Sequence, residues 1–81
     1  MKLICKNIEE RVLKVYIEPS TDIVTLNSGD ILELSPKFES PLNFEIHIVD
    51  GDLVIWLPCG QSALLFINGK KIDSLCEALI W

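Results

Sequence analysis

Apolar and polar positions alternate most clearly in the middle of the chain. Two runs rich in β-branched and aromatic residues, residues 44–49 and 52–57, flank the dipeptide Asp50-Gly51. This pattern is the strongest short-range signal for a β-hairpin, and a two-residue type I′ turn would place Val49 opposite Asp52. The sequence therefore predicts a central hairpin whose register is fixed by its turn.

Six apolar side chains share one face of this hairpin, because alternate residues of a strand point the same way. Across the ladder, Ile48 is expected opposite Leu53, Ile46 opposite Ile55, and Phe44 opposite Leu57. The other face places Glu45 opposite Trp56 and His47 opposite Val54. Because an isolated hairpin is barely stable in water, we expect the apolar face to be buried against a second sheet.

Five further segments show strand character. They are residues 1–6, 12–18, 22–27, 31–35 and 63–67, and Asn68-Gly69 is a second hairpin turn that returns through residues 70–72. Many short strands separated by Gly or Pro turns are typical of all-β domains. We therefore predict one all-β domain, residues 1–81, as a small antiparallel β-sandwich or jelly-roll-like barrel of about six to seven short strands.

Two local patterns refine this prediction. A bulged loop at Ser28-Gly29 would bring the apolar residues of 22–27 beside those of 31–35, so we expect these two strands to pair. Near the end, Ser74-Leu75-Cys76-Glu77 has the spacing of a capping box. It allows a short C-terminal helical turn.

Composition narrows the function classes. Hydrophobic residues make up 49% of the 81 residues and the mean hydropathy is +0.37, which is apolar for so small a soluble domain. We expect part of this apolar surface to contact a protein partner or a second copy of the chain, as in a homodimer. The net charge of −5 argues against direct nucleic-acid binding, and no apolar run approaches the roughly 18–20 residues of a membrane span.

The N-terminal residues and the cysteines bear on localisation. Leu3-Ile4-Cys5 is interrupted by Lys6, so the sequence shows no signal-peptide core. Cys5, Cys59 and Cys76 have no paired spacing, which favours reduced thiols over a disulfide framework. We therefore expect a cytoplasmic protein.

Candidate chemistry is sparse. A Cys59–His47 or Cys76–His47 pair is open as a hydrolase alternative, although no local motif supports it. No His and Cys spacing matches a zinc site, and the turn accounts for Asp50 and Asp52. We therefore predict no catalytic residues, no metal and no cofactor.

Aromatic residues are the better candidates for binding. Trp56 and His47 share the outer face of the hairpin and Tyr16 could join them, whereas Phe38 lies in a loop as a contact residue or a plug for the core. Exposed aromatics beside polar groups are common in binding sites. The alternative is that a second layer of the same domain covers Trp56.

Residues 51–68 resemble the second motif of the cupin family. Gly51, then Pro58-Cys59-Gly60, then Asn68 are similar to the glycine, turn and asparagine of that motif, while Ala63 stands where the family has a metal-binding histidine. The resemblance implies a jelly-roll shape without the metal or the enzyme activity. A second stretch, Glu18-Pro19 followed by Gly29-Asp30, is similar to small bacterial β-proteins of no assigned function, and it implies no mechanism.

These observations favour a non-enzymatic binding or interaction protein. One specific form is an acidic inhibitor or immunity-type protein, because negative charge steers association with a cationic partner. The alternative is a jelly-roll module that binds a small ligand without a metal.

Overall fold

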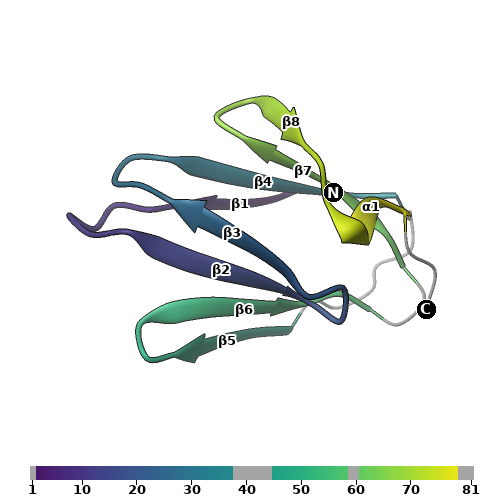
Figure 1. The fold of residues 1–81 in the computed structure, drawn as a ribbon, viewed down its shortest axis with the longest axis horizontal. Helices are drawn as coiled ribbons and strands as arrows, with labels where there is room; N and C mark the ends of the chain where they lie inside the picture. Colours follow the sequence, from purple (N-terminus) through teal and green to yellow (C-terminus); the bar gives the residue numbers. More distant parts are fainter. Residues whose placement is uncertain (1, 38–44, 59–60, 79–81) are drawn as a thin grey trace.

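The computed structural model describes residues 2–37, 45–58 and 61–78 (Figure 1). In these residues the chain forms β1 (Leu3–Lys6), β2 (Leu13–Glu18), β3 (Asp22–Leu26), β4 (Ile31–Pro36), β5 (Glu45–Val49), β6 (Asp52–Trp56), β7 (Ala63–Ile67), β8 (Lys70–Ile72) and α1 (Leu75–Ala78). The all-β prediction and the short C-terminal helical turn are confirmed. The described residues contain eight strands, one more than the upper end of the predicted range.

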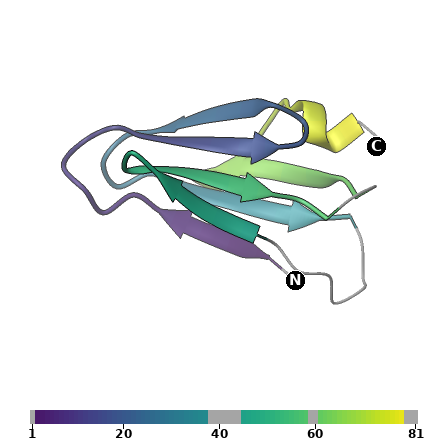
Figure 2. The ribbon, with the colours of Figure 1, turned by 90° about the horizontal axis from the view of Figure 1, so that it is seen from below.

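The strands form two four-stranded sheets that lie face to face (Figures 1 and 2). One sheet has the order β1-β4-β7-β8, and the other has the order β3-β2-β6-β5. Neighbouring strands are antiparallel, except that β2 and β6 run parallel. The structure thus confirms the sandwich rather than the closed barrel, and it adds a parallel pair that the sequence pattern did not reveal.

The central hairpin has the predicted register. Val49 pairs with Asp52, and the ladder continues through Glu45 opposite Trp56. Asp50 and Gly51 have φ angles of 50° and 80°, as a type I′ turn requires. The predicted Phe44–Leu57 pair lies outside the described residues.

The apolar face of the hairpin is only partly buried, which corrects the expectation that it is covered along its whole width. Ile55 is 1% exposed, but Ile46 and Ile48 are 49% and 77% exposed. The reason is their place in the sheet: β6 lies second from the edge, whereas β5 is the edge strand. The opposite sheet covers the inner side chains of β6 and leaves those of β5 in solvent.

The expected pairing of residues 22–27 with 31–35 is wrong. β3 and β4 belong to different sheets, and the turn between them crosses from one layer to the other. The Asp30 amide donates to the Asn27 carbonyl at 3.0 Å inside this turn. Val24 and Leu26 therefore meet the apolar residues of β4 across the core, which satisfies the same apolar pattern without a shared ladder.

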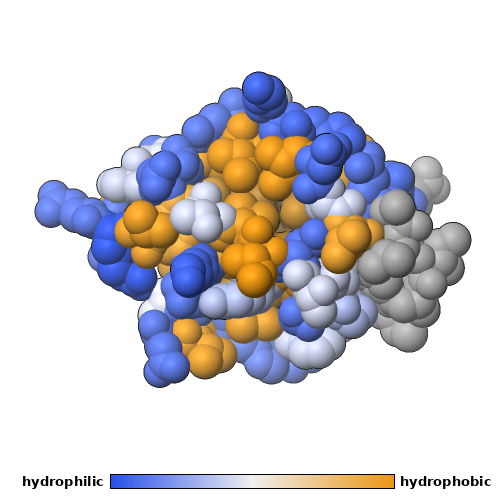
Figure 3. All heavy atoms as spheres, viewed as in Figure 1, coloured by the Kyte–Doolittle hydropathy of each residue, from blue (hydrophilic) through white to orange (hydrophobic). Residues whose placement is uncertain are grey.

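The core fills the space between the sheets. Its members are almost inaccessible to solvent: Leu13, Val15, Ile17, Val24, Leu26 and Ile55 from one sheet, and Leu32, Leu34, Ala63 and Leu65 from the other, with Leu57 and Cys76. Around this core, the view in Figure 3 shows apolar side chains gathered over β7, β8 and β3, with polar side chains surrounding them. Apolar side chains from both sheets thus meet in one core between the two layers.

Asn7 secures the loop that joins the two sheets at one end. Its side chain is 1% exposed, and its Nδ2 donates to the carbonyls of Arg11 and Leu26 at 2.7 and 3.0 Å. Its Oδ1 accepts the Glu9 amide at 3.0 Å. Because a buried polar group is costly without partners, these bonds make Asn7 a structural residue in a segment that the sequence marks only as a loop.

Asp22 closes the opposite side of the sandwich by capping α1. Its two carboxylate oxygens accept the amides of Leu75 and Cys76 at 2.7 and 2.9 Å, and one of them also accepts the Ser20 hydroxyl at 2.7 Å. The first amides of a helix lack partners within the helix. The capping-box spacing thus predicted the helix correctly, but the acceptor is Asp22 and not Ser74.

This capping makes stability depend on the charge of Asp22. Partial burial acts to raise the pKa of Asp22, but the hydrogen bonds from Leu75, Ser20 and Cys76 outweigh it and hold the pKa below its ordinary value of 3.8. A depressed carboxyl pKa adds stability that is fully present above the unfolded pKa and is lost as the pH falls through the folded one.

We predict that Asp22→Ala lowers the free energy of unfolding by about 1–2 kcal/mol at neutral pH, as loss of a helix cap does. Urea unfolding at several pH values measures it. Asp22→Asn is the matched variant that cannot titrate, so the advantage of the wild type over it should shrink below pH 3.8. An advantage that is the same at every pH would contradict this account.

The two hairpin turns offer a second test. Gly51 and Gly69 have nearly equal φ angles of 80° and 82°, but only at Gly51 would an added Cβ meet a neighbour, Arg11 Nη2 at 2.9 Å. We predict that Gly69→Ala lowers the free energy of unfolding by about 1 kcal/mol, through backbone strain alone. Gly51→Ala should lower the free energy of unfolding further, because Arg11 must also give up its hydrogen bond to the Gly51 carbonyl. Equal thermal unfolding temperatures of the two variants would refute the role of Arg11.

Candidate functional site

The outer face of the β3-β2-β6-β5 sheet brings separate parts of the chain into one surface. Tyr16 on β2 pairs with Val54 on β6, and Val54 pairs with His47 on β5. One row further along, Trp56 lies between Glu18 and Glu45. Side chains in directly opposite positions lie within contact distance, so these two rows make one continuous surface.

Three of the four predicted binding residues lie on this face. Trp56 is 39% exposed, His47 is exposed and Tyr16 is half-buried. The parallel pairing of β2 with β6 is what brings Tyr16 beside the hairpin. None of the described elements forms a second layer over Trp56, so the alternative that it is covered does not hold for this part of the chain. Phe38 lies outside the described residues.

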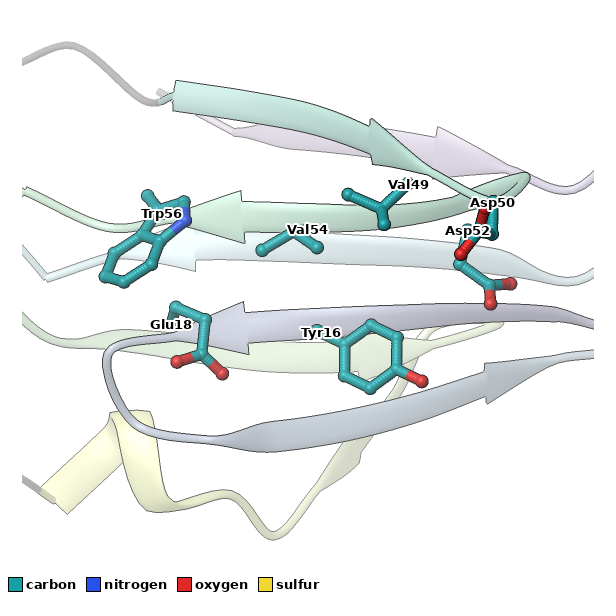
Figure 4. Close-up of a pocket in the computed structure, with 7 residues that line it drawn as sticks. All are labelled: Tyr16, Glu18, Val49, Asp50, Asp52, Val54 and Trp56. Atoms are coloured by element: carbon teal, nitrogen blue, oxygen red, sulfur yellow. The ribbon is translucent and has the colours of Figure 1, made fainter.

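A shallow groove of about 400 Å³ runs along this face. Its floor is apolar, formed by Tyr16, Val54 and Trp56, and Figure 4 shows Glu18 at the end of the groove near Trp56. At the other end the groove is lined by Asp50, Asp52 and Val49 (Figure 4). The groove thus combines an aromatic floor with carboxylates at both ends.

The carboxylates of the groove are the residues that sequence reasoning missed. The turn pattern accounts for Asp50 and Asp52, and Glu18 ends a predicted strand before Pro19. Asp52 does support the backbone, because its Oδ1 accepts the Lys14 amide at 3.1 Å. Glu18 lies beside Trp56 because β2 and β6 pair in parallel. A pairing between strands so far apart in the chain leaves no local pattern in the sequence, so no sequence signal identifies Glu18.

The electrostatics of this face are acidic. Strands β2, β5 and β6 carry the carboxylates of Glu18, Glu45 and Asp52 on their outer side. Lys14 is the one lysine in these three strands. His47 Nε2 lies 2.9 Å from the Glu45 carboxylate, and both side chains are exposed. An exposed pair of this kind contributes little to stability.

The two thiols that the structure describes, those of Cys5 and Cys76, are partly or fully buried. Cys76 is 0% exposed, its Sγ donates to the Ala63 carbonyl at 3.5 Å, and burial raises its pKa to about 11. Burial also raises the pKa of the half-buried Cys5 thiol. Because His47 lies on the outer face of the other sheet, the Cys76–His47 pair does not form. Cys59 lies outside the described residues.

Two other kinds of feature are absent from residues 2–37, 45–58 and 61–78. No group of three or more His, Cys, Asp or Glu side chains in these ranges could hold a metal ion. Across the same ranges, no helix has the length and apolar character to cross a membrane. The groove on the outer sheet face, with its aromatic floor and its carboxylates, is the candidate site.

Comparisons with protein-family models, with curated proteins and with solved structures found no match to this chain. The similarity to cupins stays a prediction from the motif. Ala63, at the position of the family's histidine, is 0% exposed in the core between the sheets.

Proposed function

We propose that this protein is a small non-enzymatic binding protein that holds a basic segment of a protein partner in the groove of its outer sheet face. The observation that carries the proposal is the combination of exposed aromatic rings with carboxylates in one groove. Trp56 and Tyr16 supply the rings, and Glu18, Asp50 and Asp52 supply the charge. This combination matches both halves of a lysine or arginine side chain.

A basic side chain has an apolar stem and a cationic end. The stem fits the floor formed by Tyr16, Val54 and Trp56, and the cation fits either an aromatic ring or a carboxylate at the ends of the groove. A cation over an exposed aromatic ring is worth about 0.5–1 kcal/mol, and an exposed ion pair about 0–1 kcal/mol. One side chain therefore binds weakly, and useful affinity needs a segment with several basic residues.

The charge of the whole chain supports the same kind of partner. A net charge of −5 attracts a cationic surface from a distance and raises the rate of encounter. Together with the local carboxylates, it favours an acidic inhibitor or immunity-type protein that neutralises a basic partner. This specific form of the proposal predicts binding that weakens as salt increases.

The dimensions of the groove support a second candidate, a small cationic ligand. A volume of about 400 Å³ lies in the range of roughly 300–1,000 Å³ that is typical of small-molecule sites. The groove lies outside the sandwich, since the interior is filled by the core. The aromatic floor would then serve as an open cage for an ammonium group.

Affinity capture from a lysate at low and high salt tests the proposal when the bait is compared with two double variants. Glu18→Gln/Asp52→Asn removes two charges at the groove, and the new carboxamide at position 52 retains an oxygen that can accept the Lys14 amide. Glu9→Gln/Glu10→Gln removes two charges from an exposed loop elsewhere. We expect a stoichiometric basic partner that the wild type and the loop variant retain at low salt and the groove variant loses.

Two outcomes would contradict the proposal. The first is equal loss of the partner in both double variants, which would mean that net charge alone governs binding. The second is recovery of the bait alone. In that case, quenching of Trp56 fluorescence by benzyltrimethylammonium, absent in Trp56→Phe, would favour the small cationic ligand.

A further inference from the structure

The four edge strands of the sandwich differ in how they are protected. Lys2 precedes β1, Lys6 is its last residue, and the three-residue β8 begins with Lys70-Lys71. Lysines and short edge strands oppose pairing with another chain. At the start of β3, Asp22 is engaged by the first amides of α1.

β5 has none of these protections. Its sequence, Glu-Ile-His-Ile-Val, contains no lysine, proline or glycine, and each of its five residues is exposed. Among the described strands, β6 is its one neighbour. A regular apolar edge strand of this kind is a template for a further strand.

The register of the hairpin shows which backbone groups are available. In a two-residue hairpin the pair that closes the turn, here Val49 and Asp52, exchanges hydrogen bonds, and such pairs alternate along the ladder. The amide and carbonyl of His47 thus face β6. Those of Ile46 and Ile48 face the open edge, and the side chains of the same two residues are 49% and 77% exposed.

We propose that β5 pairs antiparallel with β5 of a second copy of this chain, about a two-fold axis at His47, to form a continuous eight-stranded sheet. The strand is self-complementary in this register. Ile46 lies opposite Ile48 of the second copy on both sides of the axis, and these are the residues whose backbone groups face the edge. The contact is isologous and closes after two copies.

Charge and shape favour a second copy of this chain as the partner at the open edge of β5. On the outer face each His47 lies diagonal to Glu45 of the other copy, within reach of a long side chain, while its own Glu45 is 2.9 Å away. On the inner face Ile48 borders a hollow of about 330 Å³ that Cys5 and Leu53 also line. Ile46 of the second copy enters beside Ile48 and covers this apolar side of the sandwich.

This inference rests on the edge of β5 and not on the groove, so either proposal can fail alone. Sedimentation of the purified protein over a dilution series is expected to show a monomer–dimer equilibrium. Ile48→Lys should raise the dimer dissociation constant at least tenfold, because two ammonium groups would face an apolar contact. Ile23→Lys is the matched control: Ile23 is 62% exposed on the other edge strand of the same sheet, and its substitution should leave the equilibrium unchanged.

A cysteine at the axis tests the register itself. In the proposed pairing His47 faces His47 of the second copy as a non-hydrogen-bonded pair, with Cα atoms about 4.5 Å apart, within the range that a disulfide spans. Under mild oxidation His47→Cys should give a 47–47 linked dimer, identified by mass spectrometry of the linked peptides, and Ile23→Cys should not. A wild type that is monomeric at every concentration, or a dimer that survives Ile48→Lys and forms no 47–47 link, would overturn the proposal.

Discussion

The structure depends on burying one apolar face of each four-stranded sheet against the other. β6 is the strand through which this burial is organised, since it runs parallel to β2 on one side and antiparallel to β5 on the other. Ile55 is 1% exposed because it sits under the opposite sheet, and Ile17 beside it is 0% exposed. Each such side chain stabilises the fold by roughly 2 kcal/mol, so the two sheets hold together through their central strands. Polar contacts of Asn7 and Asp22 secure the connecting loop and the short helix at the ends of the sandwich.

The same constraint determines what remains exposed. A two-layer sandwich covers only the inner face of each sheet, so the rings of Tyr16 and Trp56 remain on the outside with their carboxylate neighbours. At the edge, Ile48 is 77% exposed and gains little of the roughly 2 kcal/mol available from burial. The groove and the edge of β5 lie side by side on one sheet, so the two proposed contacts would use neighbouring surfaces, and the proposed dimer would carry two grooves on one continuous sheet.

Local patterns predicted the local structure. The Asp50-Gly51 turn set the register of the hairpin, and that register correctly placed Glu45 opposite Trp56 and His47 opposite Val54. The pairing of strands that are distant in the chain could not be predicted from the sequence pattern. The pattern of Val24 and Leu26 is the same whether β3 and β4 share a ladder or face each other across a core, and the structure takes the second arrangement. Likewise, the burial of Ile48 depends on where β5 sits in its sheet, and the capping of α1 depends on a carboxylate 53 residues away.

Amide hydrogen exchange along β5 measures whether this strand is a free edge that can pair with a second copy. In dilute solution we predict slow exchange for the His47 and Val49 amides, which face β6, and fast exchange for the Ile46 and Ile48 amides. At high protein concentration the Ile46 and Ile48 amides should become protected as well. Protection of Ile46 and Ile48 at every dilution would show that the edge is already covered within one chain, and fast exchange at every concentration would show that no second copy binds there.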